Sequence, residues 1–187
     1  MVKLQLAGAH TLLLSPLCSR CPHGRAGCCA APPAIAWADI GRIVALGGRD
    51  WLLEQIRSEN LRPVARGLAM RRAPAATIGG EVYPERCGYL GPTGCTLAPD
   101  RRSATCNYYL CDEGFAEGRG QPDAALARDA HERLVALYGR WDLEIKEDID
   151  AHFAGAIAWD AAFLDWIGEA WKKRERGARK ALRALSP

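Results

Sequence analysis

Long apolar runs are missing from this sequence of 187 residues. No stretch approaches the ~20 consecutive apolar residues that a membrane helix needs, so we expect no membrane-spanning segment. Residues 1–17 also lack the uninterrupted apolar core and the small-residue cleavage site of a secretory signal. Leu17 stands before Cys18, where a lipidation signal would have a small residue. Together these absences predict a cytoplasmic location with reducing conditions.

A strong charge of one sign is lacking as well. The chain has 25 Lys and Arg against 22 Asp and Glu, and a net charge of +3 is too small to indicate a polyanionic partner. Basic residues crowd into 172–183, a pattern that can contact phosphates but is typical of a solvated helix end. Walker, dinucleotide-binding and serine-hydrolase motifs are absent too. We therefore expect no membrane and no nucleic-acid partner; a zinc module for nucleic acid is the weakest alternative.

Cysteine, by contrast, is abundant, with eight residues in the chain. In a reducing compartment, so many cysteines favour metal or redox chemistry over disulfides. The CxxC pair Cys18 and Cys21 forms a knuckle from which two thiolates can converge on one metal. The adjacent Cys28 and Cys29 point in different directions, which suits two sites or a cluster whose irons lie apart. The candidate metal ligands are Cys18, Cys21, Cys28, Cys29, Cys87, Cys95, Cys106 and Cys111.

The identity of the metal stays open between zinc and an iron-sulfur cluster, because four thiolates suit either one. Eight cysteines could hold two zinc ions, one cluster with an extra zinc, or one four-cysteine site beside four bystanders. Any of the last four cysteines could instead be a buried small hydrophobic residue. His23, inside the knuckle, is interpreted as a solvent-facing loop residue rather than a replacement ligand.

The residues around the cysteines follow a wider pattern. It comprises Cys18, Cys21, Cys28 and Cys29, Asp39-Ile40, Arg42-Ile43, Cys87-Gly88-Tyr89-Leu90, Gly94-Cys95-Thr96-Leu97, Arg102, and Cys106-Asn107-Tyr108-Tyr109-Leu110-Cys111. Over its first two thirds the chain thereby resembles the bacterial cysteine-cluster family with a CxxCxxCC signature, described as zinc- or iron-chelating. It departs from that pattern in a wider spacing before Cys28, in Ser103 where proline is usual, and in Asn107 where arginine is usual.

The resemblance implies a metal-binding protein whose role is structural or concerned with metal or redox chemistry. Relatives in the family include a methyltransferase that acts on flagellin lysines. A metal-cluster-dependent enzyme of a tailoring or protein-modifying type is therefore the alternative function, and the sequence leaves open whether the chain catalyses a reaction. No catalytic or cofactor-binding residue follows from the pattern, nor does an oligomeric state or a protein partner.

Local signals predict mostly helix outside the cysteine loops. Proline and glycine crowd residues 16–33, so no regular helix is expected around the first four cysteines. Asp39 is predicted to cap a short helix ended by a glycine pair, and this role is favoured over orienting a metal ligand. Asp50 is predicted to cap a second helix. Residues 62–80 are predicted to form an irregular connection, because proline and glycine break them repeatedly.

Further along the chain, Cys87 and Cys95 are predicted to flank a tight, strand-flanked loop, and one helical turn is expected between Cys106 and Cys111. The last third is predicted to contain a helix that begins at Pro122 and weakens at Gly139, a following helical segment, and a final helix. Its aromatic residues are interpreted as core or interface. Within the following segment, Glu144, Asp148 and His152 form a polar line. A solvated face explains this line better than a metal site, because no second helix carries matching ligands.

We therefore predict a mainly α, single small domain with irregular cysteine-rich loops around one or two metal sites. Residues 1–120 would form the cysteine-cluster metal-binding region, and residues 121–187 a helical region packed on it. At this length the chain can bury an adequate apolar core without disulfides.

Overall fold

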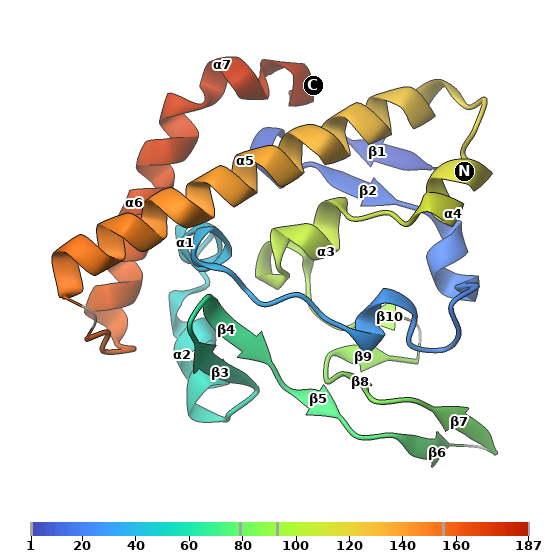
Figure 1. Ribbon diagram of the computed structural model, residues 1–187, viewed down its shortest axis with the longest axis horizontal. Helices are drawn as coiled ribbons and strands as arrows, with labels where there is room; N and C mark the ends of the chain where they lie inside the picture. Colours follow the sequence, from blue (N-terminus) through green and yellow to red (C-terminus); the bar gives the residue numbers. More distant parts are fainter. Residues whose placement is uncertain (1, 79, 93, 155, 187) are drawn as a thin grey trace.

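Helix α5, Pro122–Phe153, is the longest element and runs across the whole molecule in Figure 1. This computed structural model describes residues 2–78, 80–92, 94–154 and 156–186. The predicted weakening at Gly139 is wrong, because α5 continues through that glycine without a break. Tyr138 and Trp141 beside it are buried, and their burial outweighs the roughly 1 kcal/mol by which glycine disfavours a helix.

Three other helices form the core together with α5. They are α1, Trp37–Ala45, α2, Arg49–Arg57, and α6, Ala161–Gly177. Helix α1 packs against both α6 and α5. Two glycines allow α1 and α6 to approach closely: a Cβ on Gly41 would lie 2.6 Å from the Cβ of Trp171, and one on Gly168 would lie 2.7 Å from Cγ1 of Val44. The chain is therefore a mainly helical single domain, as predicted, and α7, Arg179–Leu182, extends its C-terminal end.

Both predicted helix caps near the N-terminal end of the core are wrong. Helix α1 begins at Trp37, so Asp39 lies inside its first turn, where its carboxylate accepts a hydrogen bond from the backbone N–H of Ala36 at 3.2 Å. Helix α2 follows Gly48 as its N-cap, and Asp50 lies in its first turn. The side chain of Asp39 is buried, which points to contacts beyond its own helix.

In the described part of the chain, the strands pair as five antiparallel two-stranded sheets. The pairs are β1, Lys3–Gln5, with β2, Leu12–Leu14; β3, Leu61–Val64, with β4, Gly67–Met70; β5, Arg72–Ala73, with β8, Arg86–Cys87; β6, Ala76–Ile78, with β7, Glu81–Tyr83; and β9, Leu90–Gly91, with β10, Gly94–Cys95. Strands β8 and β10 flank the predicted loop between Cys87 and Cys95, but strand β9 lies inside it, so part of this segment is a short hairpin.

The predicted irregular connection over residues 62–80 is wrong, because β3 and β4 form a hairpin there. Leu61 and Leu68 are fully buried, and Leu68 forms a bridge with Ile35. Burial of these apolar residues stabilises the hairpin although Pro63 lies in it, a residue that edge strands tolerate. Among the described residues, no helix is long and apolar enough to cross a bilayer.

Candidate metal centre

The first four cysteines lie on two short 3-10 turns. Turn η2, Pro16–Arg20, carries Cys18 and is followed by Cys21, and turn η3, Gly27–Ala30, carries Cys28 and Cys29. Ser15 caps η2 by accepting a hydrogen bond from the backbone N–H of Leu17 at 3.2 Å. The irregular structure predicted for this segment is confirmed, and no regular α-helix interrupts it.

The last four cysteines lie on four different elements. Cys87 ends β8 and Cys95 ends β10, while Cys106 lies within α3, Ala104–Tyr108. Cys111 is the N-cap of α4, Asp112–Glu117. The helical turn predicted between Cys106 and Cys111 is thus displaced toward the N-terminus and includes Cys106.

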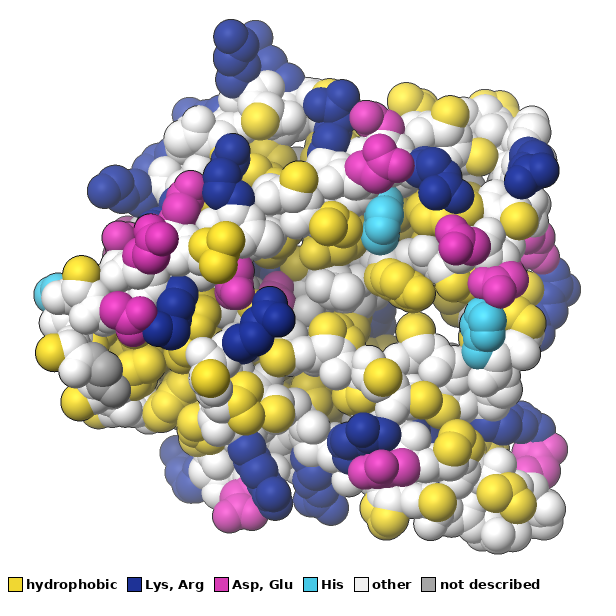
Figure 2. All heavy atoms as spheres, in the orientation of Figure 1, with side chains coloured by type: hydrophobic (Ala, Val, Ile, Leu, Met, Phe, Trp, Pro, Cys, Tyr) yellow, Lys and Arg dark blue, Asp and Glu magenta, His cyan; other side chains and the backbone are white. Residues whose placement is uncertain are grey.

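Two contacts bring these distant parts of the chain together. Turn η3 packs against β8, and turn η2 packs against α4. In Figure 1 the blue segment that contains η2 and η3 accordingly lies beside the green segment from β8 to α4. Figure 2 shows that this face of the molecule is hollowed in the neighbourhood of η3 and the β9–β10 hairpin. The fold thus gathers the cysteine-bearing elements on one side of the molecule.

The thiols influence one another's ionisation across these contacts. Burial raises the pKa of Cys18, and negative charge on Cys28, Cys111 and Cys21 adds to the rise. Burial raises the pKa of Cys106 to about 12, with further contributions from Asp39, Cys95, Cys28 and Cys87. Burial also raises the pKa of Cys87, with contributions from Cys95 and Cys28. Negative charge on Cys28 contributes to all three rises, so ionisation of Cys28 disfavours ionisation of Cys18, Cys87 and Cys106.

Cys28 and Cys29 are coupled directly. The Cys29 thiol donates a hydrogen bond to the sulfur of Cys28, which lowers the pKa of Cys28 to about 6. The same hydrogen bond, followed by burial, raises the pKa of Cys29. Cys28 is also exposed, so its sulfur is accessible to solvent, and the lowered pKa favours its thiolate form. A thiolate is the form of cysteine that binds metals.

Gly27 makes room for the thiol of Cys21. Its φ angle is +50°, and a Cβ on this residue would lie 2.7 Å from Sγ of Cys21. A side chain at this position would therefore displace the thiol. Cys87 has a different environment, because it is buried and its sulfur lies 3.7 Å from that of Met70.

Among the described residues, the thiols do not converge on one point. Within residues 2–78, 80–92, 94–154 and 156–186, no three of the eight thiols lie within 4.8 Å of one another. One group of possible ligands in the same ranges does meet this limit, and it consists of His23, Cys111 and Glu113. His23 is half exposed, as a loop histidine would be, but its Nε2 lies 3.1 Å from Oε2 of Glu113. Sequence reasoning missed Glu113, for which the Cys111-x-Glu113 spacing is the only local signal.

Two residues that depart from the family pattern have structural roles next to α3. Ser103, fully buried, donates a hydrogen bond from Oγ to the carboxylate of Asp39 at 2.9 Å. Asn107 donates from Nδ2 to the carbonyl of Pro99 at 2.7 Å. These bonds fix the short helix that carries Cys106, so the substitutions are compatible with an ordered cysteine region.

The polar line on α5 serves an ion-pair network. The guanidinium of Arg174, on α6, lies 3.1 Å from the carboxylate of Glu144 and 2.6 Å from that of Asp148. His152 stacks on the ring of Trp166 at 5.4 Å between centroids. The carboxylates therefore hold α5 to α6, in agreement with the interpretation that this line is not a metal site.

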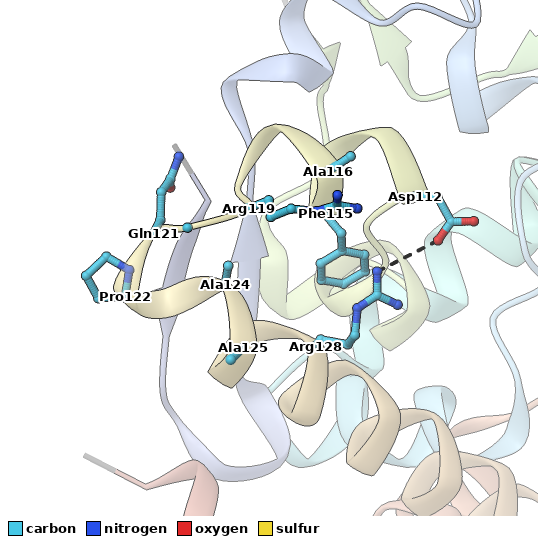
Figure 3. A pocket seen from close by; sticks show the side chains of 10 residues that line it. Asp112, Phe115, Ala116, Arg119, Gln121, Pro122, Ala124, Ala125 and Arg128 are labelled. Carbon is cyan, nitrogen blue, oxygen red and sulfur yellow. Dashed lines mark ion pairs between the residues drawn. The ribbon is translucent and has the colours of Figure 1, made fainter.

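An open cavity of about 790 Å³ lies between α4 and the start of α5 (Figure 3). Arg128 reaches across it, with its guanidinium 4.3 Å from the ring centre of Phe115 and 4.0 Å from the carboxylate of Asp112. The side chains that line the cavity include Arg119 and Gln121, and none of them is a cysteine. A molecule bound in this cavity would therefore contact no cysteine among the residues that line it.

Comparisons with family models, with curated proteins and with solved structures gave no match to this chain. Membership of the cysteine-cluster family accordingly remains a prediction that depends on the residues quoted above.

Proposed function

We propose that this chain is a metal-binding protein that holds zinc or an iron-sulfur cluster through the thiolates of its cysteines. The observation that carries the proposal is the packing of four cysteine-bearing elements in two pairs, η3 with β8 and η2 with α4. Cysteines far apart in sequence can share a metal only when the fold packs their elements together in this way.

Electrostatics supports the same proposal. Burial is the main reason that the pKa values of Cys18, Cys87 and Cys106 are raised, and negative charge on other thiols adds to the rise. A bound cation reverses this effect, because it favours the deprotonated form of every sulfur that it contacts. A metal bound at these thiols would therefore offset the cost of ionising them.

The metal would have a structural role in this region. Strands β8, β9 and β10 contain two residues each, and the residues of β10 are exposed. Strand pairs of this size are not stable on their own in water. Helices α1, α5 and α6, by contrast, bury continuous apolar faces. Binding of metal by the thiolates would join the short elements to one another, and a structural zinc of this kind contributes ~10 kcal/mol or more to folding.

The first experiment is elemental analysis and visible spectroscopy on protein purified without oxygen. Iron with acid-labile sulfide and visible absorption would identify a cluster, and colourless protein with stoichiometric zinc would identify structural zinc. The Cys28→Ser variant is expected to lose metal, while Ala30→Ser, which adds the same hydroxyl to η3 without removing a thiol, should retain it. Protein without iron, zinc or another transition metal would overturn the proposal.

Hydrogen exchange before and after chelation tests the structural role. Chelation should remove protection from residues 16–30 and 86–111 and leave the amides of α1, α5 and α6 protected. Unchanged exchange in the cysteine segments of a protein that has lost its metal would show that the metal does not hold these loops.

A further inference from the structure

Three different types of metal ligand lie together at the surface: the imidazole of His23, the thiol of Cys111 and the carboxylate of Glu113. His23 lies in the turn between η2 and η3, whereas Cys111 and Glu113 lie at the start of α4. The packing of η2 against α4 brings the imidazole to the thiol and the carboxylate. Their ligand atoms all lie within 4.8 Å of one another, and Nε2 of His23 lies 3.1 Å from Oε2 of Glu113.

We propose that these three side chains bind a divalent cation of the zinc type at a site of their own, separate from the thiolate-only group around Cys28. The inference deepens the proposed metal-binding function and rests on it, because it assigns Cys111 to a second, chemically distinct site. Eight cysteines then divide between a sulfur-rich site and a mixed nitrogen, sulfur and oxygen site.

The spacing of the donors fits such an ion. Zinc binds imidazole nitrogen and carboxylate oxygen at ~2.0–2.2 Å and thiolate sulfur at ~2.3 Å. A tetrahedral arrangement at these lengths separates the donors by roughly 3.3–3.7 Å. The observed separations, 3.1 Å for the His23–Glu113 pair and at most 4.8 Å within the group, bracket this range. Small rotations of exposed side chains are enough to close the site around an ion.

Charge and donor softness fit the ion as well. A thiolate and a carboxylate neutralise a divalent cation, and the neutral imidazole adds no charge. Imidazole and thiolate together suit zinc and cobalt, whereas magnesium and calcium prefer oxygen ligands alone. The site thus selects a divalent transition metal over the abundant hard cations.

The site has an open fourth position and contacts solvent. Three protein ligands leave one position of a tetrahedral zinc site for water. The side chains of His23 and Glu113 are 50% and 49% exposed, so an ion held there can exchange with solvent. The mixed site should therefore load and release metal more readily than the sulfur-rich group.

Anaerobic titration of the metal-free full chain with Co²⁺ tests the proposal, since cobalt reports its thiolate ligands by charge-transfer absorption. The wild-type chain should bind cobalt in two classes. His23→Ala and Glu113→Gln should each weaken the mixed class by more than the roughly 10–100-fold that loss of an outer-shell partner causes. His23→Cys should retain this class with stronger charge-transfer absorption, because a second thiolate replaces the imidazole. Cys87→Ser should disturb the sulfur-rich class and leave the mixed class intact.

Two variants control for general effects of the substitutions. Glu117→Gln changes a carboxylate on the same helix that pairs with Arg20 instead, and His152→Ala removes a histidine from the far end of α5. Both should bind cobalt as the wild-type chain does. Cobalt binding that is unchanged in His23→Ala and Glu113→Gln would overturn the mixed site and leave the proposed function standing. A wild-type chain that binds neither cobalt nor zinc would overturn the proposed function itself.

Discussion

The carboxylate of Asp39 accepts a hydrogen bond from the backbone N–H of Ala104 at 2.6 Å. Asp39 belongs to core helix α1, and Ala104 is the first residue of α3, which carries Cys106. The same carboxylate lies 4.0 Å from the guanidinium of Arg42, and both side chains are buried. A charged pair in the core therefore fixes the position of one candidate ligand in the cysteine region.

Replacement of Asp39 should destabilise the whole domain. Asp39→Ala leaves the buried Arg42 without its counterion and removes the acceptor of Ala104, so we expect the free energy of unfolding to fall by about 3–5 kcal/mol. Urea unfolding followed by circular dichroism measures this loss. Asp50→Ala is the matched control, because its side chain is 83% exposed on α2, and it should change stability by less than about 0.5 kcal/mol. Equal losses in the two variants would contradict the role of Asp39.

A methyl group at position 27 should weaken metal binding through Cys21. Gly24 and Gly27 both have positive φ angles, so alanine strains the backbone at either position by roughly 1–2 kcal/mol. Only at position 27 would the new Cβ also meet a thiol, that of Cys21, while a Cβ at position 24 would meet nothing within 4 Å. Gly27→Ala should therefore lose metal affinity that Gly24→Ala retains, as competition with a chromophoric chelator would measure. Equal affinities in the two variants would show that Cys21 is not a ligand.

The sequence allowed the helical core to be predicted because apolar spacing is a local property. The buried face of α5 repeats at helical intervals on both sides of Gly139, and only the local propensity of that glycine misled the prediction. The β3–β4 hairpin was missed for a related reason. Its turn residues resemble breakers, whereas its stability comes from Leu68 packed beside Ile35, a partner far along the chain.

The residue types of the candidate site could be predicted from the sequence, but the division of the ligands between metal sites could not. The order of the cysteines indicates metal ligands, but the proximity of His23 to Glu113 depends on the packing of η2 against α4. Asp39 is a comparable case, because a first-turn aspartate looks like a helix cap until its contact with Ala104 is known. Contacts between residues far apart in sequence leave no local pattern from which they could be predicted.

Substitution of the carboxylates on α5 should leave the metal content unchanged. Glu144 and Asp148 both pair with Arg174, and both carboxylates are about half exposed. We expect Glu144→Gln and Asp148→Asn to reduce the free energy of unfolding by about 1 kcal/mol or less each. Elemental analysis should find the same metal per chain as in the wild type. Loss of metal from either variant would contradict the structural role of this polar line.

Alkylation of the metal-free chain should single out Cys28 as pH rises. Its lowered pKa of about 6 makes the thiol reactive above pH 6, whereas an ordinary cysteine with a pKa of 9.0 becomes reactive only in alkaline solution. At pH 7 about nine-tenths of Cys28 would be thiolate, against about one-hundredth of an ordinary cysteine. Peptide mass mapping after brief iodoacetamide treatment measures this difference. A range from about pH 5 to about pH 9 covers the ionisation of Cys28 and reaches that of an ordinary cysteine.

Two comparisons identify the source of the effect. Cys18 is also exposed, but its pKa is raised, so it should react only at higher pH in the same samples. Cys29→Ala removes the thiol that donates its hydrogen bond to Cys28, so the pKa of Cys28 should rise. Alkylation of Cys28 at pH 7 should then slow severalfold or more. The rate should fall by less than the thiolate fraction does, because a more basic thiolate is the better nucleophile. If Cys28 and Cys18 titrate together in the wild-type chain, the hydrogen bond between the adjacent cysteines does not control this thiol. If they separate as expected, the pair supplies at neutral pH a preformed thiolate to which a metal can bind first.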